Sequence, residues 1–370
     1  MADIDGIVRA NIRNIIPYDP KQVEYLIKLD ANENPYGLPA SVEKRLRKFA
    51  GNPDIYRLYP DSNCTSLRRK IAAFWKTGEE NIVVGKGSDE IIQLLVEVFV
   101  DPEDVIVAPS PSFEMYAAAA RIAGGRVVYV NLSKESDFEY DANGFTEAAN
   151  ASNAKIIFLC TPNNPTGNTM PVEAIEYIAA MCPRSVVAVD EAYAEFGAMT
   201  AADLTGKYGN VIVLRTFSKA WGLAGLRCGY SIASADMTRY LMAVKPPYNV
   251  PAYSQTAASE ILDASAEISM RTDGIIAERE HLAVLLKSEI PGIKVFPSKA
   301  NFLLVQLTGE IGMSGEEAYR ALAATGILVR SFRNSPQLSD CIRVTIGTRG
   351  QNDIFAGEFK KVCGGKAAML

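Results

Sequence analysis

Short apolar runs rich in β-branched residues alternate with helix-like stretches through the middle of the chain. These runs are apolar on both faces, which is typical of strands buried between two layers of helices. The pattern predicts an α/β fold in which a mostly parallel central sheet is covered by helices. The predicted strands lie at 81–85, 105–109, 126–132, 155–160, 185–190, 210–216 and 227–233.

The last hundred residues follow a different pattern. Strand-like runs alternate there with two helix-like stretches, an α+β order that predicts a second, smaller domain. Three prolines interrupt the pattern within 245–254, so we place the boundary there. We expect a large domain over 45–250, and an N-terminal arm plus a small C-terminal domain formed by 1–44 and 251–370. The late strands are expected at 293–307, 326–332 and 341–347.

Charge and hydropathy argue against nucleic-acid binding and membrane insertion. The net charge of -5 and the pI near 5.3 lack the basic bias of a nucleic-acid-binding protein. The longest apolar run, 91–100, is too short to cross a membrane, and the N-terminus lacks the apolar core of a signal peptide. We therefore expect a cytoplasmic protein that binds neither nucleic acid nor membrane.

Cysteine and histidine exclude further classes of site. The six cysteines are scattered without a C-x-x-C pair, which argues against a disulfide framework and against a zinc site. The single histidine, His281, lies in a charged helix-like stretch. Histidine-metal clusters and Ser-His-Asp or Cys-His hydrolysis each need a histidine in the site, so we expect no metal and no such hydrolase.

Polar residues gather directly after the predicted strands. Ligands of open α/β sheets bind beyond the carboxyl ends of the strands, so these segments are candidates for one shared site. Each motif alone also has a structural explanation: a capped turn, an Asn-Pro turn or an internal ion pair. The segments are KGSDE, PSPSF, TPNNPTGN, DEAY and RTFSK.

Three of these segments complement one another chemically. The two glycines of GKGSDE precede a helix start, where backbone N–H groups can hold a phosphate. Asp190 ends an apolar strand, and a buried carboxylate needs a partner. Lys219 can form a Schiff base when its amine is neutral. A phosphate cradle, a carboxylate and a lysine together describe a pyridoxal-phosphate pocket.

The motifs also resemble a known family. NNPTG, DEAY, TFSKAWGLAGLRCGY and IRVTIG, in this order, are similar to those of the fold-type-I pyridoxal-phosphate aminotransferases. Within that family, PYDP, KLDANENPYGLP, YRLYPD, GKGSDEII and PSFEMY resemble the histidinol-phosphate aminotransferase group. The resemblance runs from about residue 17 to residue 350.

The resemblance implies roles around the cofactor ring. Lys219 would hold pyridoxal 5′-phosphate covalently and then move the substrate Cα proton. Asp190 would pair with the pyridine nitrogen. Asn164 and Tyr193 would donate hydrogen bonds to the ring O3′, and Phe113 would stack on the ring face, where many relatives carry tyrosine.

The resemblance also implies how the cofactor phosphate is held. The charged anchor would be Arg227, which explains why an arginine follows Lys219 in the chain. Tyr59 would reach the phosphate from the other subunit, so the resemblance implies a homodimer. The remaining phosphate-binding residues would be Gly87, Ser88, Asp89, Thr216 and Ser218.

For the substrate, Arg343 matches the arginine that binds the α-carboxylate or its equivalent, a contact that suits a planar guanidinium. Arg330 matches a second substrate-contacting arginine. Asn32 and Tyr36 would lie in the N-terminal arm that covers the site. Each arginine taken alone is also compatible with a surface ion pair.

The implied reaction is the reversible transfer of an amino group between histidinol phosphate and 2-oxoglutarate, as in histidine biosynthesis. The products would be imidazole-acetol phosphate and glutamate, by ping-pong kinetics. An aromatic amino-acid aminotransferase and threonine-phosphate decarboxylase share the same site residues and stay open. A nicotinamide dehydrogenase is disfavoured because GKGSDE is not its glycine fingerprint. A non-enzymatic binding protein is disfavoured because it would have no need of Lys219.

Overall fold

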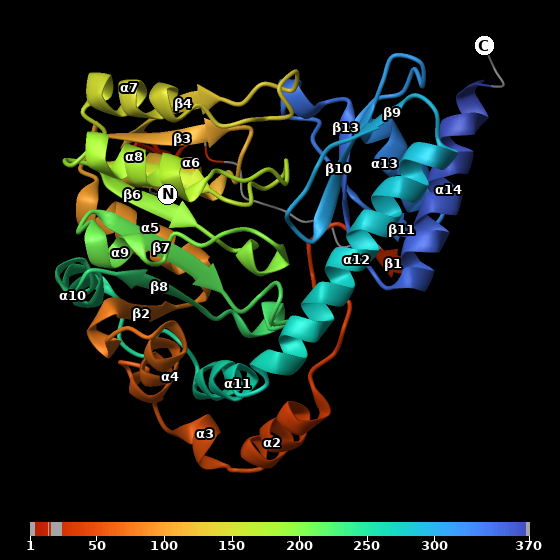
Figure 1. Ribbon diagram of the computed structural model, residues 1–370. Coiled ribbons are helices and arrows are strands. Elements are labelled where there is room, and N and C mark those ends of the chain that lie inside the picture. The colour runs from red at the N-terminus through yellow and green to blue at the C-terminus, as the bar shows by residue number, and fades with distance from the viewer. Residues whose placement is uncertain (1–3, 14, 16–23, 368–370) are drawn as a thin grey trace.

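The computed structural model describes residues 4–13, 15 and 24–367. The PYDP motif at 17–20 lies outside the described residues. A large twisted sheet and a small antiparallel sheet stand side by side, and the long helix α12 (Ser265–Glu289) runs toward the small sheet (Figure 1).

The large sheet has seven strands in the order β2-β8-β7-β6-β5-β3-β4. All neighbouring strands are parallel except that β8 is antiparallel to both β2 and β7, which confirms the predicted mostly parallel sheet. The strands are β2 (Ile82–Gly85), β3 (Val105–Ser110), β4 (Arg126–Asn131), β5 (Ile156–Cys160), β6 (Val186–Asp190), β7 (Val211–Thr216) and β8 (Gly229–Ala233).

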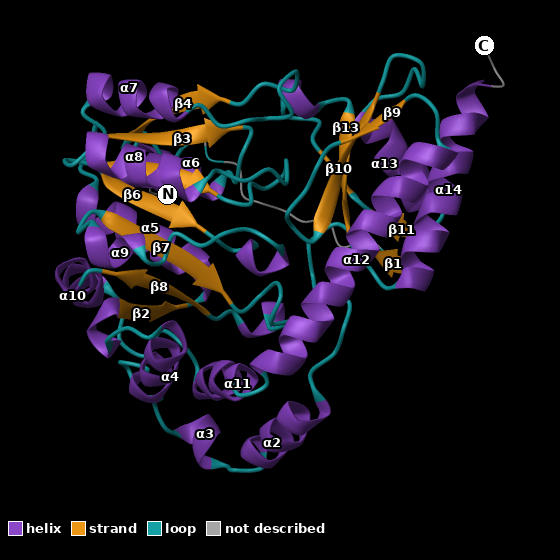
Figure 2. Cartoon of the chain, viewed as in Figure 1, coloured by secondary structure: helices purple, strands orange, loops and turns teal. Residues whose placement is uncertain are grey.

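Both faces of this sheet are buried because alternate residues of each central strand point to opposite sides. In β5, Ile156 and Phe158 pack with α5, α6 and α10, while Ile157 and Leu159 pack with α7, α8 and α9. Figure 2 shows these helices on either side of the strands. They are α5 (Gly87–Phe99), α6 (Met115–Ala123), α7 (Ala142–Ser152), α8 (Val172–Met181), α9 (Leu204–Lys207) and α10 (Ala235–Val244).

The expectation that every strand is buried on both faces is wrong for β4. Its side chains are exposed or half-buried, and the ring of Tyr129 is 43% exposed. β4 is an edge strand that pairs only with β3 in this sheet, whereas the other edge strand, β2, is buried because α4 and α5 pack with its side chains. The apolar sequence of β4 did not distinguish an edge strand from a central one.

The small sheet is antiparallel, in the order β12-β13-β10-β9, and a short parallel pair, β1-β11, ties the N-terminal segment to it. The expected small α+β unit is therefore present. Its strands are β9 (Ile293–Val295), β10 (Phe302–Leu307), β12 (Arg330–Ser331) and β13 (Cys341–Thr345), with β1 (Ile27–Lys28) and β11 (Ile327–Leu328) in the pair. Its helices are α13 (Gly315–Ala324) and α14 (Arg349–Ala367), which pack beside α12.

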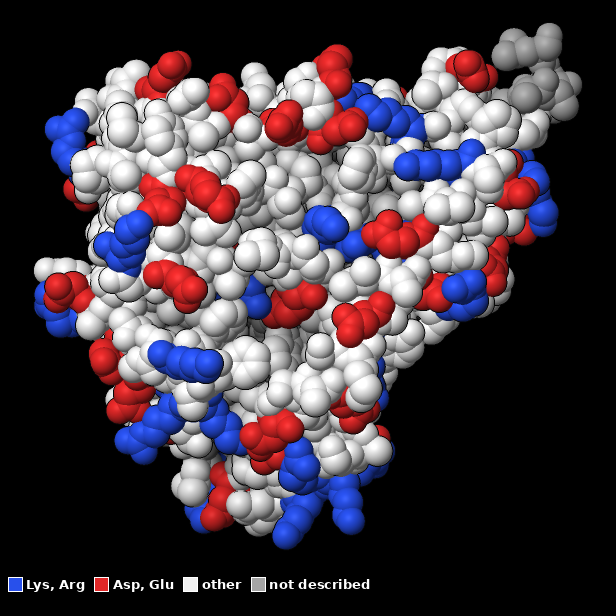
Figure 3. Space-filling model, viewed as in Figure 1, with Lys and Arg blue, Asp and Glu red and all other residues white. Residues whose placement is uncertain are grey.

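The remaining helices lie around β2 and along the N-terminal segment. Side chains of α4 and α11 pack in one core with β2 and β8. None of the described helices is long and apolar enough to cross a bilayer. On the face shown in Figure 3, basic and acidic side chains are intermixed. These helices are α1 (Ile4–Ile7), α2 (Ala40–Ala50), α3 (Asp54–Arg57), α4 (Thr65–Trp75) and α11 (Ala252–Leu262), with single 3-10 turns at η1 (Glu79–Asn81), η2 (Ala194–Phe196), η3 (Ala224–Leu226) and η4 (Pro336–Leu338).

Candidate active site

The predicted site segments meet because they follow parallel strands that end at one edge of the sheet. Asp190, the last residue of β6, pairs in register with Cys160 of β5 and Leu214 of β7. The segments after β5, β6 and β7 therefore leave the sheet side by side, facing the small sheet (Figure 2). They carry Asn164, Tyr193 and Lys219.

Asp190 is a buried carboxylate whose hydrogen-bond partners among residues 4–13, 15 and 24–367 are uncharged. Its Oδ2 accepts a 2.7 Å hydrogen bond from the Tyr116 hydroxyl and its Oδ1 a 3.0 Å bond from the Ala192 N–H. Burial raises the pKa of Asp190 to about 6, and the negative charges of Asp89 and Glu191 also raise it. Within the described part of the chain, the ionised carboxylate therefore has no hydrogen-bonded counter-charge.

Lys219 has the opposite charge and the same kind of surroundings. Its Nζ donates a 3.0 Å hydrogen bond to the Ala31 carbonyl and lies 5.6 Å from the centre of the Tyr193 ring. Burial, together with the positive charges of Arg343 and Arg227, lowers the pKa of Lys219 to about 8. A substantial fraction of the amine is therefore neutral near pH 8, as a nucleophile or base requires.

The N-terminal segment delivers Asn32 to Tyr193. The Asn32 side-chain amide donates a 2.9 Å hydrogen bond to the Tyr193 hydroxyl. Asn32 has a φ of 54°, and its N–H bonds Thr345 Oγ1 at 2.9 Å. The Tyr193 ring packs edge-on against Phe302 of β10 at 5.3 Å, so this tyrosine contacts the N-terminal segment and the small sheet.

The backbone approach at the start of α5 depends on two glycines. A Cβ on Gly229 would lie 2.6 Å from the Ser88 nitrogen, and a Cβ on Gly87 would lie 2.9 Å from an Arg227 guanidinium nitrogen. Gly87 also has a φ of 76°. The glycines thus let the Ser88 N–H and the Arg227 guanidinium come together at a helix N-terminus. Arg227 pairs there with Asp89 at 2.8 Å, and both side chains are exposed.

Two hydroxyls lie beside this helix start. The Thr216 hydroxyl donates to Ser218 Oγ at 3.0 Å and accepts from the Ser218 N–H at 3.1 Å. Thr216 pairs in register with Gly229, which in turn pairs with Gly85, two residues before Gly87. The expected phosphate-binding residues of the subunit itself are thus brought together.

Arg343 links the small sheet to the large one. From β13 it donates hydrogen bonds to the Asn164 side-chain oxygen and to the Asp30 carbonyl. Its guanidinium lies 5.3 Å from the centre of the Phe302 ring. Arg330 of β12 pairs in register with Arg343, which places both arginines on the same face of the sheet.

Among the described residues, three further predicted ones lie near this site or at the surface and form no hydrogen bond with Asp190 or Lys219. Phe113 is half-buried and its ring packs edge-on against Tyr116 at 5.6 Å. Tyr36 lies at the surface, 36% exposed. Tyr59 is 82% exposed and its ring stacks on Tyr248 at 4.6 Å, so within one subunit it lies on the surface.

The comparisons with known proteins agree with this geometry. The family model for class I and II aminotransferases matches residues 24–359. The chain belongs to this family.

Relatives with named activities indicate which group within the family this chain is similar to. The chain is 43% identical over 360 residues to the histidinol-phosphate aminotransferase of Ruminiclostridium cellulolyticum, covering 97% of this chain and 99% of that protein. It is 38% identical to the protein of that name from Caldanaerobacter subterraneus, with the same coverage. The crystal structure of histidinol-phosphate aminotransferase from Sinorhizobium meliloti in complex with pyridoxal-5′-phosphate matches with a TM-score of 0.85 and 25% identity over 92% of each chain.

Aspartate aminotransferase from Thermus thermophilus matches with a TM-score of 0.79 at 21% identity and supports the fold alone. The predicted fold-type-I aminotransferase fold is thus confirmed.

Sequence reasoning missed three groups of this aminotransferase site. Tyr116, which bonds Asp190, lies within the PSFEMY motif. Asn34 donates hydrogen bonds to the carbonyls of Lys219 at 3.2 Å and Ala220 at 2.9 Å, and the Ala31 carbonyl accepts from Lys219. Both N-terminal residues lie within the ANENPYG stretch, so the motifs contained the signal but not the contacts.

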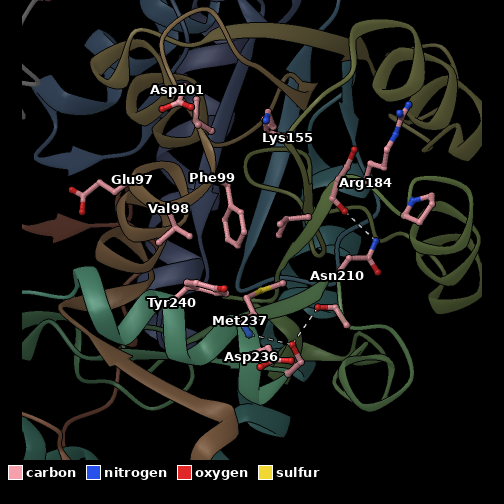
Figure 4. Close-up of a pocket in the computed structure, with 16 residues that line it drawn as sticks. Glu97, Val98, Phe99, Asp101, Lys155, Arg184, Asn210, Asp236, Met237 and Tyr240 are labelled. Carbon is pink, nitrogen blue, oxygen red and sulfur yellow. Dashed lines mark hydrogen bonds between the residues drawn. The ribbon is translucent and has the colours of Figure 1, made fainter.

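A separate hollow lies at the opposite edge of the large sheet. Figure 4 shows Lys155 and Asn210 at its wall, the residues just before β5 and β7. Its volume is about 620 Å³, and its lining also includes Phe99, Arg184 and Tyr240. None of the predicted site residues lines it, so the aminotransferase chemistry belongs to the other edge.

Proposed function

We propose that this aminotransferase transfers the amino group of histidinol phosphate to 2-oxoglutarate, forming imidazole-acetol phosphate and glutamate. The observation that carries the proposal is the 43% identity over 97% of the chain to a histidinol-phosphate aminotransferase. The site geometry supports the reaction class, because a partly neutral lysine and an uncompensated carboxylate lie beyond adjacent strands.

The cofactor that fits these residues is pyridoxal 5′-phosphate. Asp190 offers a buried negative charge that suits a protonated ring nitrogen. Arg227, the Ser88 N–H and the paired hydroxyls of Thr216 and Ser218 form a donor set that suits a phosphate. When bound, the cofactor supplies an aldehyde for amine attachment and an electron-withdrawing ring.

We assign the chemistry of the protein's own groups as follows. The Lys219 amine would hold the cofactor aldehyde, and as a free base it would take and return the proton at the substrate Cα. Asp190 keeps the ring nitrogen protonated, and the Tyr116 hydroxyl fixes the orientation of its carboxylate. Asn164 and Tyr193 orient the ring oxygen, and Phe113 covers the ring.

Substrate binding falls to the small sheet and the N-terminal segment. Arg343 has a planar guanidinium that suits the carboxylate of glutamate, and Arg330 lies on the same sheet face for a second anionic group. Histidinol phosphate has no carboxylate, so its phosphate uses these arginines. Asn32 and Tyr36 lie in the covering segment, where Asn32 already bonds Tyr193.

We also propose that the enzyme is a homodimer. Exposed apolar side chains gather around Tyr59, including its neighbours Tyr56 and Leu58 and the ring of Tyr248 beneath it. Tyr59 would contact the partner's phosphate cradle. Light scattering should give twice the chain mass, and Tyr59→Phe should lower cofactor affinity; a monomer that binds the cofactor as tightly as the wild type contradicts this.

Two further expectations stay proposals. The large cofactor-binding domain would span 45–250, with 1–44 and 251–370 forming the arm and small domain; limited proteolysis should cut first near 245–251. A cytoplasmic location is supported by six buried, free cysteines, as expected in a reducing compartment.

Half-reaction spectra test the substrate. The cofactor-loaded protein is mixed separately with histidinol phosphate, glutamate, phenylalanine and threonine phosphate, and the change in cofactor absorbance is followed. We expect histidinol phosphate and glutamate to react, with phenylalanine slower than histidinol phosphate by about tenfold or more. Faster reaction of phenylalanine would favour an aromatic aminotransferase, and carbon dioxide release from threonine phosphate would favour a decarboxylase.

A further inference from the structure

A buried ion-pair network lies directly behind the site. Arg215 of β7 donates from Nη1 to Glu191 at 2.7 Å and from Nη2 to Glu195 at 3.1 Å. The side chains of Arg215 and Glu191 are 7% and 0% exposed. One guanidinium thus bridges two carboxylates that both belong to the segment following β6.

Each carboxylate has a second set of contacts. Glu191 also accepts from the Thr200 hydroxyl at 2.7 Å and the Ala201 N–H at 2.6 Å. Glu195 also accepts from the Trp221 indole N–H at 2.9 Å. The network therefore connects the segment after β6, the segment after β7 and the loop at 200–201.

The three charged members of the network and Trp221 are near neighbours of proposed site residues in the chain. Glu191 follows Asp190, and Glu195 comes two residues after Tyr193. Arg215 precedes Thr216, and Trp221 comes two residues after Lys219. Successive residues of a strand point to opposite sides, so Arg215 of β7 points away from the side of Thr216. Glu191, whose N–H continues the ladder to the Leu214 carbonyl, likewise points away from the side of Asp190. The Arg215–Glu191 pair therefore holds these segments from the side opposite the site.

We infer that Arg215 is a positioning residue, whose forked bridge to Glu191 and Glu195 sets the distance between the segment that carries Asp190 and the segment that carries Lys219. The inference rests on the proposed function. A planar guanidinium has donors for two separate carboxylates, whereas a lysine ammonium is a single point charge. Retaining the charge is therefore insufficient, and Lys at this position should fail.

The sequence supplies a reporter for this network. The chain has two tryptophans, and both touch the network. Trp221 donates to Glu195, and the Trp75 ring lies 4.9 Å from the Arg215 guanidinium carbon while its N–H bonds the Tyr230 hydroxyl at 2.8 Å. Tryptophan emission of the whole chain thus reports on the network.

The test compares Arg215→Lys and the milder Glu195→Gln with the wild type in the full-length protein. We expect both variants to change tryptophan emission and to raise the Kd for pyridoxal phosphate, with Arg215→Lys raising it about tenfold. At saturating cofactor, kcat should fall about tenfold in Arg215→Lys while KM for the amino donor stays within about twofold. This split separates misplacement of reacting groups from weakened substrate binding.

Arg68→Lys is the matched control. Arg68 is a half-buried arginine of α4 that donates to the carbonyls of Glu79 at 2.6 Å and Ile82 at 2.9 Å, at the amino end of β2. It should leave tryptophan emission, Kd and kcat unchanged even where it lowers the melting temperature.

Wild-type Kd and kcat in a variant whose emission has changed would overturn the inference, as would unchanged emission in both variants. If Arg215→Lys does not fold, Glu195→Gln carries the same test. If the wild-type protein does not bind pyridoxal phosphate, the proposed function fails instead, which is a separate outcome.

Discussion

Two adjacent carboxylates at the end of β6 differ in whether their charge is paired. Asp190 and Glu191 are both buried, yet the hydrogen-bond partners of Asp190 are uncharged whereas Glu191 is paired with Arg215. Removing a carboxylate from water is costly without a counter-charge. The fold therefore pairs the charge of Glu191 within the protein and leaves the charge of Asp190 available to a ligand.

The two cations of the neighbouring segment repeat the contrast. Arg215 is held by two carboxylates, whereas Lys219 bonds a backbone carbonyl and has its pKa lowered to about 8 by burial and by nearby arginines. Among the buried charges of the segments that end β6 and β7, the paired ones support the site and the uncompensated ones face the reacting groups. Each prediction below tests that division.

The largest effect is expected for Lys219→Ala. It removes the amine that attaches the cofactor and moves the proton, so kcat should fall more than about a thousandfold. Cofactor should still bind through the phosphate contacts, as equilibrium dialysis can measure. Lys207→Ala is the control, because Lys207 is exposed and pairs with Glu176 at the surface. Near-normal turnover of Lys219→Ala would show that Lys219 is not the catalytic base and would contradict the proposed mechanism.

Asp190→Asn should lower kcat by about a hundred- to a thousandfold, because a neutral amide cannot keep the ring nitrogen protonated. Steady-state kinetics at saturating cofactor measures this effect. The side chain keeps its shape, so the fold should be retained by circular dichroism. If activity barely changes, the ring nitrogen has another partner and the uncompensated carboxylate needs a different explanation.

The same substitution should act oppositely on stability. A carboxyl whose pKa is raised in the folded state holds its proton more tightly there, so the cofactor-free protein loses stability as pH rises from about 4 to about 6. At pH 8, Asp190→Asn should therefore increase the free energy of unfolding of the cofactor-free protein, by up to about 3 kcal/mol. The gain should vanish at pH 4, where the wild-type carboxyl is protonated.

Glu191→Gln provides the opposite half of that comparison. Burial raises the pKa of Glu191 as well, but unlike at Asp190 a buried cation, Arg215, opposes that rise. The variant removes this paired charge and should destabilise the cofactor-free protein by about 3 kcal/mol, because the buried Arg215 loses one of its carboxylate partners. Chemical denaturation of Asp190→Asn and Glu191→Gln at pH 8 measures the change in the free energy of unfolding for each variant. Shifts of the same sign in both would contradict the division into supporting and reacting charges.

The smallest effect is expected for Arg343→Lys. Losing a two-pronged contact to the carboxylate should lower kcat/KM for glutamate by about tenfold. Arg349→Lys is the control, since Arg349 pairs with Glu278 at the surface. Equal effects of the two variants would show that Arg343 does not bind the substrate carboxylate.

Much of this molecule follows from its sequence. The apolar runs of β5, β6 and β7 predict buried parallel strands, and parallel strands bring their following segments to one edge. The sequence did not show that β4 is exposed while the other edge strand, β2, is buried, because the helices that cover a strand are set by the fold as a whole. It also did not show that Arg215 pairs with Glu191 or that Tyr116 bonds Asp190, since such contacts join residues 24 and 74 positions apart.

The most direct test of the central claim is to locate the covalent attachment of the cofactor. The protein loaded with pyridoxal phosphate is reduced with borohydride, digested and analysed by peptide mass spectrometry. The account predicts the cofactor mass on the peptide that contains Lys219, with no attachment in Lys219→Ala. Attachment at another lysine, or none in the wild-type protein, would contradict it.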